Sequence, residues 1–172
     1  TQLEQPADAA ERGLAIARAA GVTTIFNPAP AETFPASIYA LCDYIVPNET
    51  EAAAITGITP GSEDDARRAG DVLLGRGARC ALITLGDRGA LFHSRERSVL
   101  VPAIDAGKVI DTTGAGDAFV GGFATALADG FDPVAATRFG CATAGISVTR
   151  RGTAPAMPAR AEIEALLAAG GT

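Results

Sequence analysis

The 172-residue sequence contains no tryptophan, one histidine, one methionine and three cysteines. With a single histidine and no CxxC pair, it offers no ligand set for a structural zinc site. The cysteines are far apart and odd in number, so we expect reduced, buried thiols and a cytoplasmic protein. They are Cys42, Cys80 and Cys141.

Long apolar runs and an excess of positive charge are also missing. No apolar stretch approaches the length of a bilayer, so we expect no transmembrane helix, and we also expect no signal peptide. The net charge of -6, from 14 basic and 20 acidic residues, argues against nucleic acid as the main partner. The hydrophobic fraction of 48% is typical of a globular α/β protein with one real core.

Alanine-rich helical patterns alternate with short β-branched runs along the chain. The patterns predict helices at 6–21, 49–57, 62–77, 115–129, 132–149 and 159–169, and strands at 22–27, 44–48 and 80–86. The runs "GALFHS" and "SVLVPA" flank the charged turn "RERS" and predict a hairpin. This alternation predicts an α/β fold with a mostly parallel sheet and helices on both faces.

The stretch "DTTGAGDAFVGGF" places two glycines directly before an aspartate and a helix. At a helix start, backbone amides lack intrahelical partners and face the positive end of the helix dipole. Gly114, Ala115 and Gly116 therefore predict an anion site. Asp117 would repel a phosphate, but its carboxylate fits a role as proton acceptor for an attacking hydroxyl. Phosphoryl transfer to an alcohol is one interpretation, and a plain helix cap after a glycine turn is the other.

Two common nucleotide folds are excluded, because no GxxxxGK[ST] occurs and Phe119 stands where a Rossmann motif needs glycine. "DTTGAGDAFVGGF" instead resembles the C-terminal signature of the ribokinase-like (PfkB) sugar kinases. The segments "QLEQP", "NPAPA", "PNETEA", "ITLGDRGA" and "SVTRRG" are similar to segments of that family, in the same order. The resemblance spans residues 1–172, which it identifies as a nucleotide-binding and catalytic part. It implies an ATP-dependent sugar kinase, and "NPAPA" favours the branch that acts on ribose.

The resemblance also implies roles for single residues at the reacting end. Asp117 would be the general base for the 5-hydroxyl of ribose, and the amides of Gly114, Ala115 and Gly116 would form the anion hole. Glu4 would be a second sugar contact. A glutamate near a terminus would otherwise be read as a surface residue.

Asn48 and Glu51 match the family's NxxE motif, which organises Mg²⁺ and the phosphates through water. Cys141 stands where the family often has Asn or His beside the adenine, so one hydrogen bond is in doubt. From the residues alone, a solvated acid in a first helical turn is the favoured interpretation of Glu51. The residues implied to bind ATP are Asn48, Thr84, Leu85, Gly86, Asp87, Arg88, Gly89, Gly116 and Cys141.

A monovalent cation, usually K⁺ in this family, is implied beside the anion hole. The matching positions are Asp111, Thr113, Ser147, Arg150 and Gly152. Without the resemblance, Arg150 and Arg151 would be read as a solvated helix end, and 84–89 as an ordinary exit from a strand.

The resemblance covers the C-terminal portion of the family, without its first strands, its β-lid and its N-terminal sugar-binding motifs. We expect the isolated chain to be poorly soluble or oligomeric and inactive on ribose. The longer enzyme would be a homodimer that binds ribose and ATP, with no nucleic acid or membrane partner. Two alternatives stay open: a non-catalytic ATP-binding remnant or regulatory module, and a kinase for another sugar or a nucleoside.

Overall fold

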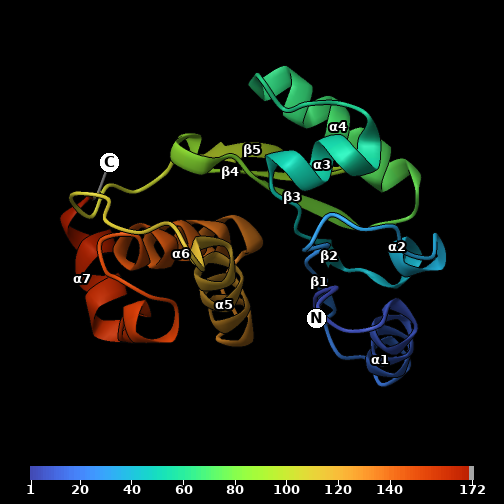
Figure 1. The fold of residues 1–172 in the computed structure, drawn as a ribbon, viewed down its shortest axis with the longest axis horizontal. Helices are drawn as coiled ribbons and strands as arrows, with labels where there is room; N and C mark the ends of the chain where they lie inside the picture. Colours follow the sequence, from blue (N-terminus) through green and yellow to red (C-terminus); the bar gives the residue numbers. More distant parts are fainter. Residues whose placement is uncertain (171–172) are drawn as a thin grey trace. The chain divides into compact units, whose positions relative to one another are not determined.

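The computed structural model describes residues 1–170, which fall into two compact units. The first comprises Thr1–Gly86 and Leu91–Leu100, and the second comprises Asp87–Ala90 and the chain from Val101 onward. The first unit holds α1 (Ala7–Ala19), β1 (Ile25–Phe26), α2 (Ser37–Leu41), β2 (Tyr44–Ile45), α3 (Glu49–Thr56), α4 (Glu63–Gly75), β3 (Cys80–Thr84) and most of β4 (Ala90–Ser94) and β5 (Ser98–Val101). The second holds α5 (Ala115–Ala128), α6 (Pro133–Ser147), the 3-10 helix η2 (Ala154–Ala156) and α7 (Arg160–Ala169), as labelled in Figure 1.

The five strands form one sheet in the order β1-β2-β3-β4-β5. β1, β2 and β3 are parallel to one another. The connections from β3 to β4 and from β4 to β5 are too short for a parallel crossover, so these neighbours are antiparallel and the sheet is mixed. The predicted class, a mostly parallel sheet flanked by helices, is confirmed, and the predicted hairpin is β4–β5. β1 is shorter than the predicted 22–27, because the Thr24 amide donates to the Asp43 carboxylate (2.9 Å) instead of a ladder partner.

Helix starts agree with the sequence to within a residue, and side-chain caps define the starts of α3, α4 and α6. Ser62 caps α4 by accepting from the Asp65 amide (3.1 Å), and the Asp65 carboxylate accepts from the Ser62 amide in return. Asp132 accepts from the Val134 amide (3.0 Å) at the start of α6, where Pro133 is the first helical residue. Each cap contributes about 1 kcal/mol, which is enough to define where a helix begins.

The core of the first unit lies against the sheet. Four strands each contribute a fully buried side chain to this core, and each such burial stabilises the fold by roughly 1.5–3 kcal/mol. These side chains are Phe26, Ile45, Ile83 and Leu91. Helices α3 and α4 pack on each other and on β3, and α1 packs on α2.

In the second unit, α5 packs closely on α6, and α6 packs on α7. The α5–α6 contact depends on small residues, since a Cβ on Gly122 would lie 2.3 Å from the Thr143 hydroxyl. The Phe119 ring of α5 lies against Gly140 of α6, and Phe123 and Phe139 are also buried. Among the described residues, no helix has both the length and the apolar character needed to cross a bilayer.

Candidate active site

Polar side chains of the first unit gather where the parallel strands end. Asn27 follows β1, Asn48 follows β2, and Thr84 is the last residue of β3. Asn48 and Thr84 form a parallel bridge, and the Thr84 amide donates to the Pro47 carbonyl (3.0 Å). The carboxyl ends of parallel strands are where open α/β sheets bind ligands, so this edge is a candidate site.

Glu51 is the centre of this cluster. Its carboxylate accepts from the Asn48 amide (2.8 Å), from the Asn48 side chain (2.9 Å) and, at 3.5 Å, from Asn27. The side chain of Asn48 in turn accepts from the Glu51 amide (2.9 Å), which completes a capping box on α3. Only 5% of Glu51 is exposed, so the interpretation as a solvated acid is wrong. Burial raises the pKa of Glu51, while the Asn48 amide and the Asn27 side chain oppose that shift.

Asn27 is a member of this cluster to which the sequence assigned no role. It is buried, and its amide group donates to the Val46 carbonyl (2.7 Å) as well as to Glu51. The Gln2 side chain donates to its carbonyl oxygen (3.2 Å). The available signal was a polar residue directly after an apolar strand, in the segment "NPAPA".

A divalent cation fits this cluster only indirectly. Both oxygens of Glu51 already accept N–H donors, so the carboxylate would order a hydrated ion through water, as Mg²⁺ prefers. Within residues 1–170, no group of three or more His, Cys, Asp or Glu side chains could hold a metal directly.

The loop after β3 includes the 3-10 helix η1 (Gly86–Arg88). The side chain of Leu85 is buried in the core of the first unit, so only its backbone remains available to a ligand. Asp87 is exposed and Arg88 is half-buried. Gly89 has a φ of 99°, and a Cβ there would lie 2.0 Å from the Val101 carbonyl oxygen, so the tight exit requires glycine.

The glycine–aspartate turn lies in the second unit, at the start of α5. Gly114 is the N-cap with a φ of 76°, and a Cβ on it would lie 3.1 Å from Cγ2 of Thr153. The Ala115 amide has no acceptor within α5, as expected, but it donates to the Thr112 carbonyl (3.2 Å) before the helix and closes the turn. The Gly116 amide has no acceptor among the described residues. Asp117 is exposed in the first helical turn.

The segment before this turn is held by the chain after α6. The Asp111 carboxylate accepts from the amides of Thr113 (3.0 Å) and Gly152 (3.1 Å). The Val148 carbonyl accepts from the amides of Ile110 (2.8 Å) and Asp111 (3.1 Å). Hydrogen bonds from Thr113 and then from Gly152 lower the pKa of Asp111.

The predicted K⁺ group therefore converges in part. Asp111, Thr113 and Gly152 are hydrogen-bonded together, and Ser147 is buried at the end of α6. Oxygen atoms of carbonyls and one carboxylate suit a hard cation. Arg150 lies partly exposed after α6, and its guanidinium pairs with Glu162.

Two other residues implied to contact ligands are Cys141, which is buried, and Glu4, which is exposed near the first residue. Cys141 is buried in α6, and burial raises the pKa of its thiol to about 12. Little of its surface remains for a base to contact. Glu4 is exposed and follows Leu3, whose amide donates to the Ala29 carbonyl (2.8 Å).

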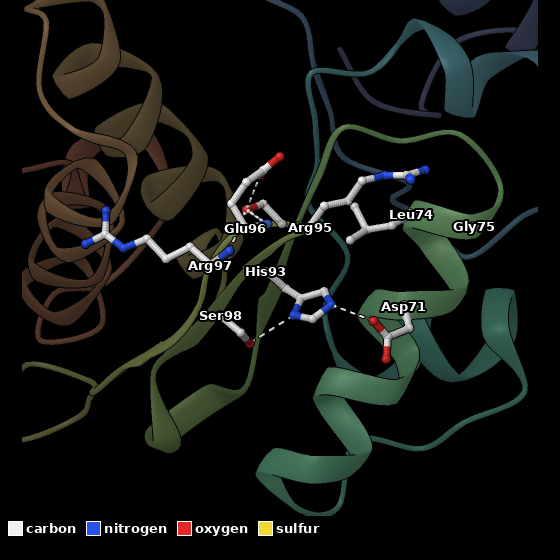
Figure 2. A pocket seen from close by; sticks show the side chains of 9 residues that line it. Asp71, Leu74, Gly75, His93, Arg95, Glu96, Arg97 and Ser98 are labelled. Carbon is white, nitrogen blue, oxygen red and sulfur yellow. Dashed lines mark hydrogen bonds and ion pairs between the residues drawn. The ribbon is translucent and has the colours of Figure 1, made fainter.

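A pocket of about 620 Å³ between α4 and the β4–β5 hairpin contains none of the predicted site residues (Figure 2). On its wall, His93 contacts the Asp71 carboxylate through Nε2 (3.0 Å) and the Ser98 hydroxyl through Nδ1 (2.9 Å). A carboxylate only accepts, so Nε2 carries the proton and Nδ1 accepts from Ser98 when the ring is neutral. This buried ring links α4 to the hairpin.

Comparison with known proteins agrees with the motifs. Residues 1–160 match the model of the pfkB family of carbohydrate kinases. Haemophilus influenzae ribokinase is 40% identical over 161 residues, which cover 94% of this chain and 52% of the relative. Salmonella typhi deoxyribokinase is 35% identical, with 91% of this chain and 51% of the relative covered. The structure of Arabidopsis thaliana ribokinase complexed with ribose and ATP has a TM-score of 0.92 and 29% identity, covering 96% and 54% of the two chains. The chain thus spans about half the length of these relatives.

Proposed function

The chain belongs to the pfkB family of carbohydrate kinases, and we propose that it carries the nucleotide-binding and catalytic residues of a ribose kinase. The reaction would transfer the γ-phosphate of ATP to the 5-hydroxyl of D-ribose. Ribose and ATP are the ligands named for the Arabidopsis thaliana structure, and ribokinase is the name of the 40% identical relative. The identity to a deoxyribokinase makes the 2-deoxy sugar the nearest competing substrate.

One observation carries this proposal, namely the juxtaposition of an open amide and an exposed carboxylate at the start of α5. The Gly116 amide donates a hydrogen bond to no described residue. Asp117, the next residue, is exposed. A helix start attracts the negative charge that spreads over a transferring phosphoryl group. The adjacent carboxylate can accept a proton instead. Gly116 can therefore stabilise the phosphoryl group while Asp117 deprotonates the attacking hydroxyl.

In the proposed step, Asp117 accepts the proton of the ribose 5-hydroxyl as the oxygen attacks the γ-phosphorus. The bond from the γ-phosphorus to the bridging oxygen breaks, and ADP leaves with its electron pair. Gly116, with the neighbouring Gly114–Ala115 backbone, would stabilise charge on the transferred group. Since Ala115 donates its amide within the turn, Gly116 carries the larger share of that role.

In the first unit, Asn48 and Glu51 would order a hydrated Mg²⁺, which neutralises phosphate charge when bound. Asn27 supports this role by donating to Glu51 from a buried position. The backbone of Gly86–Gly89 would contact the nucleotide. In the second unit, Asp111, Thr113 and the 147–152 segment would hold K⁺ through oxygen atoms. Glu4 would contact the sugar.

The oligomeric state and location form part of the same proposal. Three free, buried cysteines are consistent with a reducing compartment, so we place the protein in the cytoplasm. The longer enzyme is proposed to be a homodimer.

The test replaces Asp117 by Asn in a chimera that joins this chain to the N-terminal half of Haemophilus influenzae ribokinase. We expect turnover of ribose to fall by roughly 10²–10⁴-fold, because general-base catalysis is lost, while ATP affinity stays near that of the unmodified chimera. ADP formation and isothermal titration with ATP measure the two quantities, and rates in K⁺ and Na⁺ test the cation. Turnover within a few-fold of the unmodified chimera would reject Asp117 as the base. ATP binding without transfer to any sugar would favour the non-catalytic module.

A further inference from the structure

The C-terminal helix α7 is connected to the glycine–aspartate turn through one ion pair. Glu162, in the first turn of α7, pairs with the Arg150 guanidinium and also accepts from the Ala159 amide (2.8 Å). Arg150 belongs to the 147–152 segment, whose Gly152 amide and Val148 carbonyl bind Asp111 and Ile110. A chain of direct contacts therefore runs from Glu162 to the residues that precede Gly114.

The far end of this chain reaches the proposed anion hole. Asp111 is hydrogen-bonded on one oxygen to Thr113 and on the other to Gly152, so it fixes both segments together. Thr153, the residue after Gly152, packs over Gly114 closely enough that a Cβ on the glycine would lie 3.1 Å away. A shift of the 147–153 segment would therefore move the N-cap of α5.

α7 itself is fixed by other contacts. Arg160 pairs with Asp129, the C-cap residue of α5, and with Glu164 within α7 at 2.9 Å. Since Arg160 and the packing of α7 on α6 hold the helix, the Glu162 pair acts mainly on the 147–152 segment.

We propose that Glu162 is a positioning residue, which uses Arg150 to fix the 147–152 segment and thereby the Asp111–Gly116 turn. It touches no reacting group and acts through the backbone that presents the anion hole. The functional consequence rests on the proposed kinase activity, whereas the effect on the turn does not.

The experiment follows amide hydrogen exchange by NMR in the ligand-free chimera. In Glu162→Gln, the glutamine keeps an acceptor for the Ala159 amide, but the ion pair is lost. We expect the Asp111 and Gly152 amides to exchange roughly 2- to 5-fold faster, the range for an exposed ion pair. The matched control is Glu164→Gln, which removes an ion pair from the same helix without a link to the turn. It should leave both amides unchanged.

Two variants of Arg150 separate positioning from a general loss of stability. Arg150→Gln should reproduce the effect of Glu162→Gln, and combining the two should add nothing, because both remove one pair. Arg150→Lys keeps the charge but not the contact of two nitrogens with both Glu162 oxygens, so its exchange rates should lie between those of Arg150→Gln and the unmodified protein. Equal exchange at Asp111 and Gly152 in Glu162→Gln and Glu164→Gln would overturn the proposal, as would additive effects in the double variant.

The same variants in the chimera distinguish this proposal from the proposed function. If the unmodified chimera turns over ribose, Glu162→Gln should lower its rate by a similar factor and Glu164→Gln should not. If the unmodified chimera transfers no phosphate, the kinase proposal fails, while the exchange rates still decide the role of Glu162.

Discussion

Gly116 offers the sharpest test of the proposed anion hole, because nothing in the fold requires glycine there. A Cβ added to Gly116 meets no atom within 4 Å, and its φ is not positive. Glycine in a helix is less favourable than alanine by up to about 1 kcal/mol. Gly116→Ala should therefore stabilise the chain by roughly 0.4–1 kcal/mol.

The expected rise in melting temperature is about 1–4 °C, since 1 kcal/mol corresponds to about 2–4 °C in a chain of this size. Gly121→Ala is the matched control, because Gly121 lies in the same helix and a Cβ there also meets nothing within 4 Å. Gly114→Ala should do the opposite. Its left-handed φ of 76° costs alanine about 1–2 kcal/mol, and the new methyl would press on Thr153.

Activity should rank these three variants differently from stability. In the chimera, the methyl group of Gly116→Ala would keep the transferring phosphoryl group away from the open amide. Loss of one such donor typically lowers turnover by about 10²–10³-fold. Gly121→Ala should retain turnover. Scanning calorimetry on the chain and ADP formation in the chimera measure the two effects.

Either of two results would refute this reasoning. If Gly116→Ala melts as low as Gly114→Ala, then Gly116 has a structural role that its surroundings do not explain. If Gly116→Ala is as stable as Gly121→Ala and turns over ribose at the unmodified rate, then no phosphoryl group approaches the Gly116 amide, and the anion hole lies elsewhere.

Three further predictions concern stability and reactivity. Gly70→Ala should lower the melting temperature, because a Cβ there would lie 2.6 Å from the buried His93 ring and such overpacking typically costs about 1–3 kcal/mol. The control is Gly75→Ala in the same helix, where a Cβ meets nothing within 4 Å, and it should leave the melting temperature unreduced. The melting temperature should fall as the pH drops below about 4, because Arg68 and Ser62 hold the pKa of Asp65 in the folded chain below its ordinary 3.8, and protonation then favours the unfolded chain. Asp65→Asn should reduce the dependence of melting temperature on pH in that range, and an unchanged dependence would contradict the assignment. A thiol reagent at neutral pH should label none of the cysteines before unfolding, because burial raises the pKa of each thiol, to about 12 for Cys42 and Cys141 and about 11 for Cys80.

Much of the fold follows from local sequence. Helix starts at Ser62 and Asp132 depend on hydrogen bonds that span two or three residues, so the sequence alone predicts them. The same holds for the turn at Gly114, where a left-handed φ favours glycine. The apolar run at 80–86 predicted β3, because a strand buried on both faces needs no polar alternation.

The site needed tertiary structure, because burial and partners depend on distant segments. Glu51 occupies the position of an ordinary acid in a first helical turn, and only the approach of Asn27, 24 residues earlier, makes it a buried member of a network. Leu85 lies in a segment that resembles a nucleotide loop, yet packing directs its side chain into the core. Asp111 meets Gly152 across 41 residues. Local propensities act over a few residues and fix where elements begin, whereas the site forms only when packing brings the ends of those elements together.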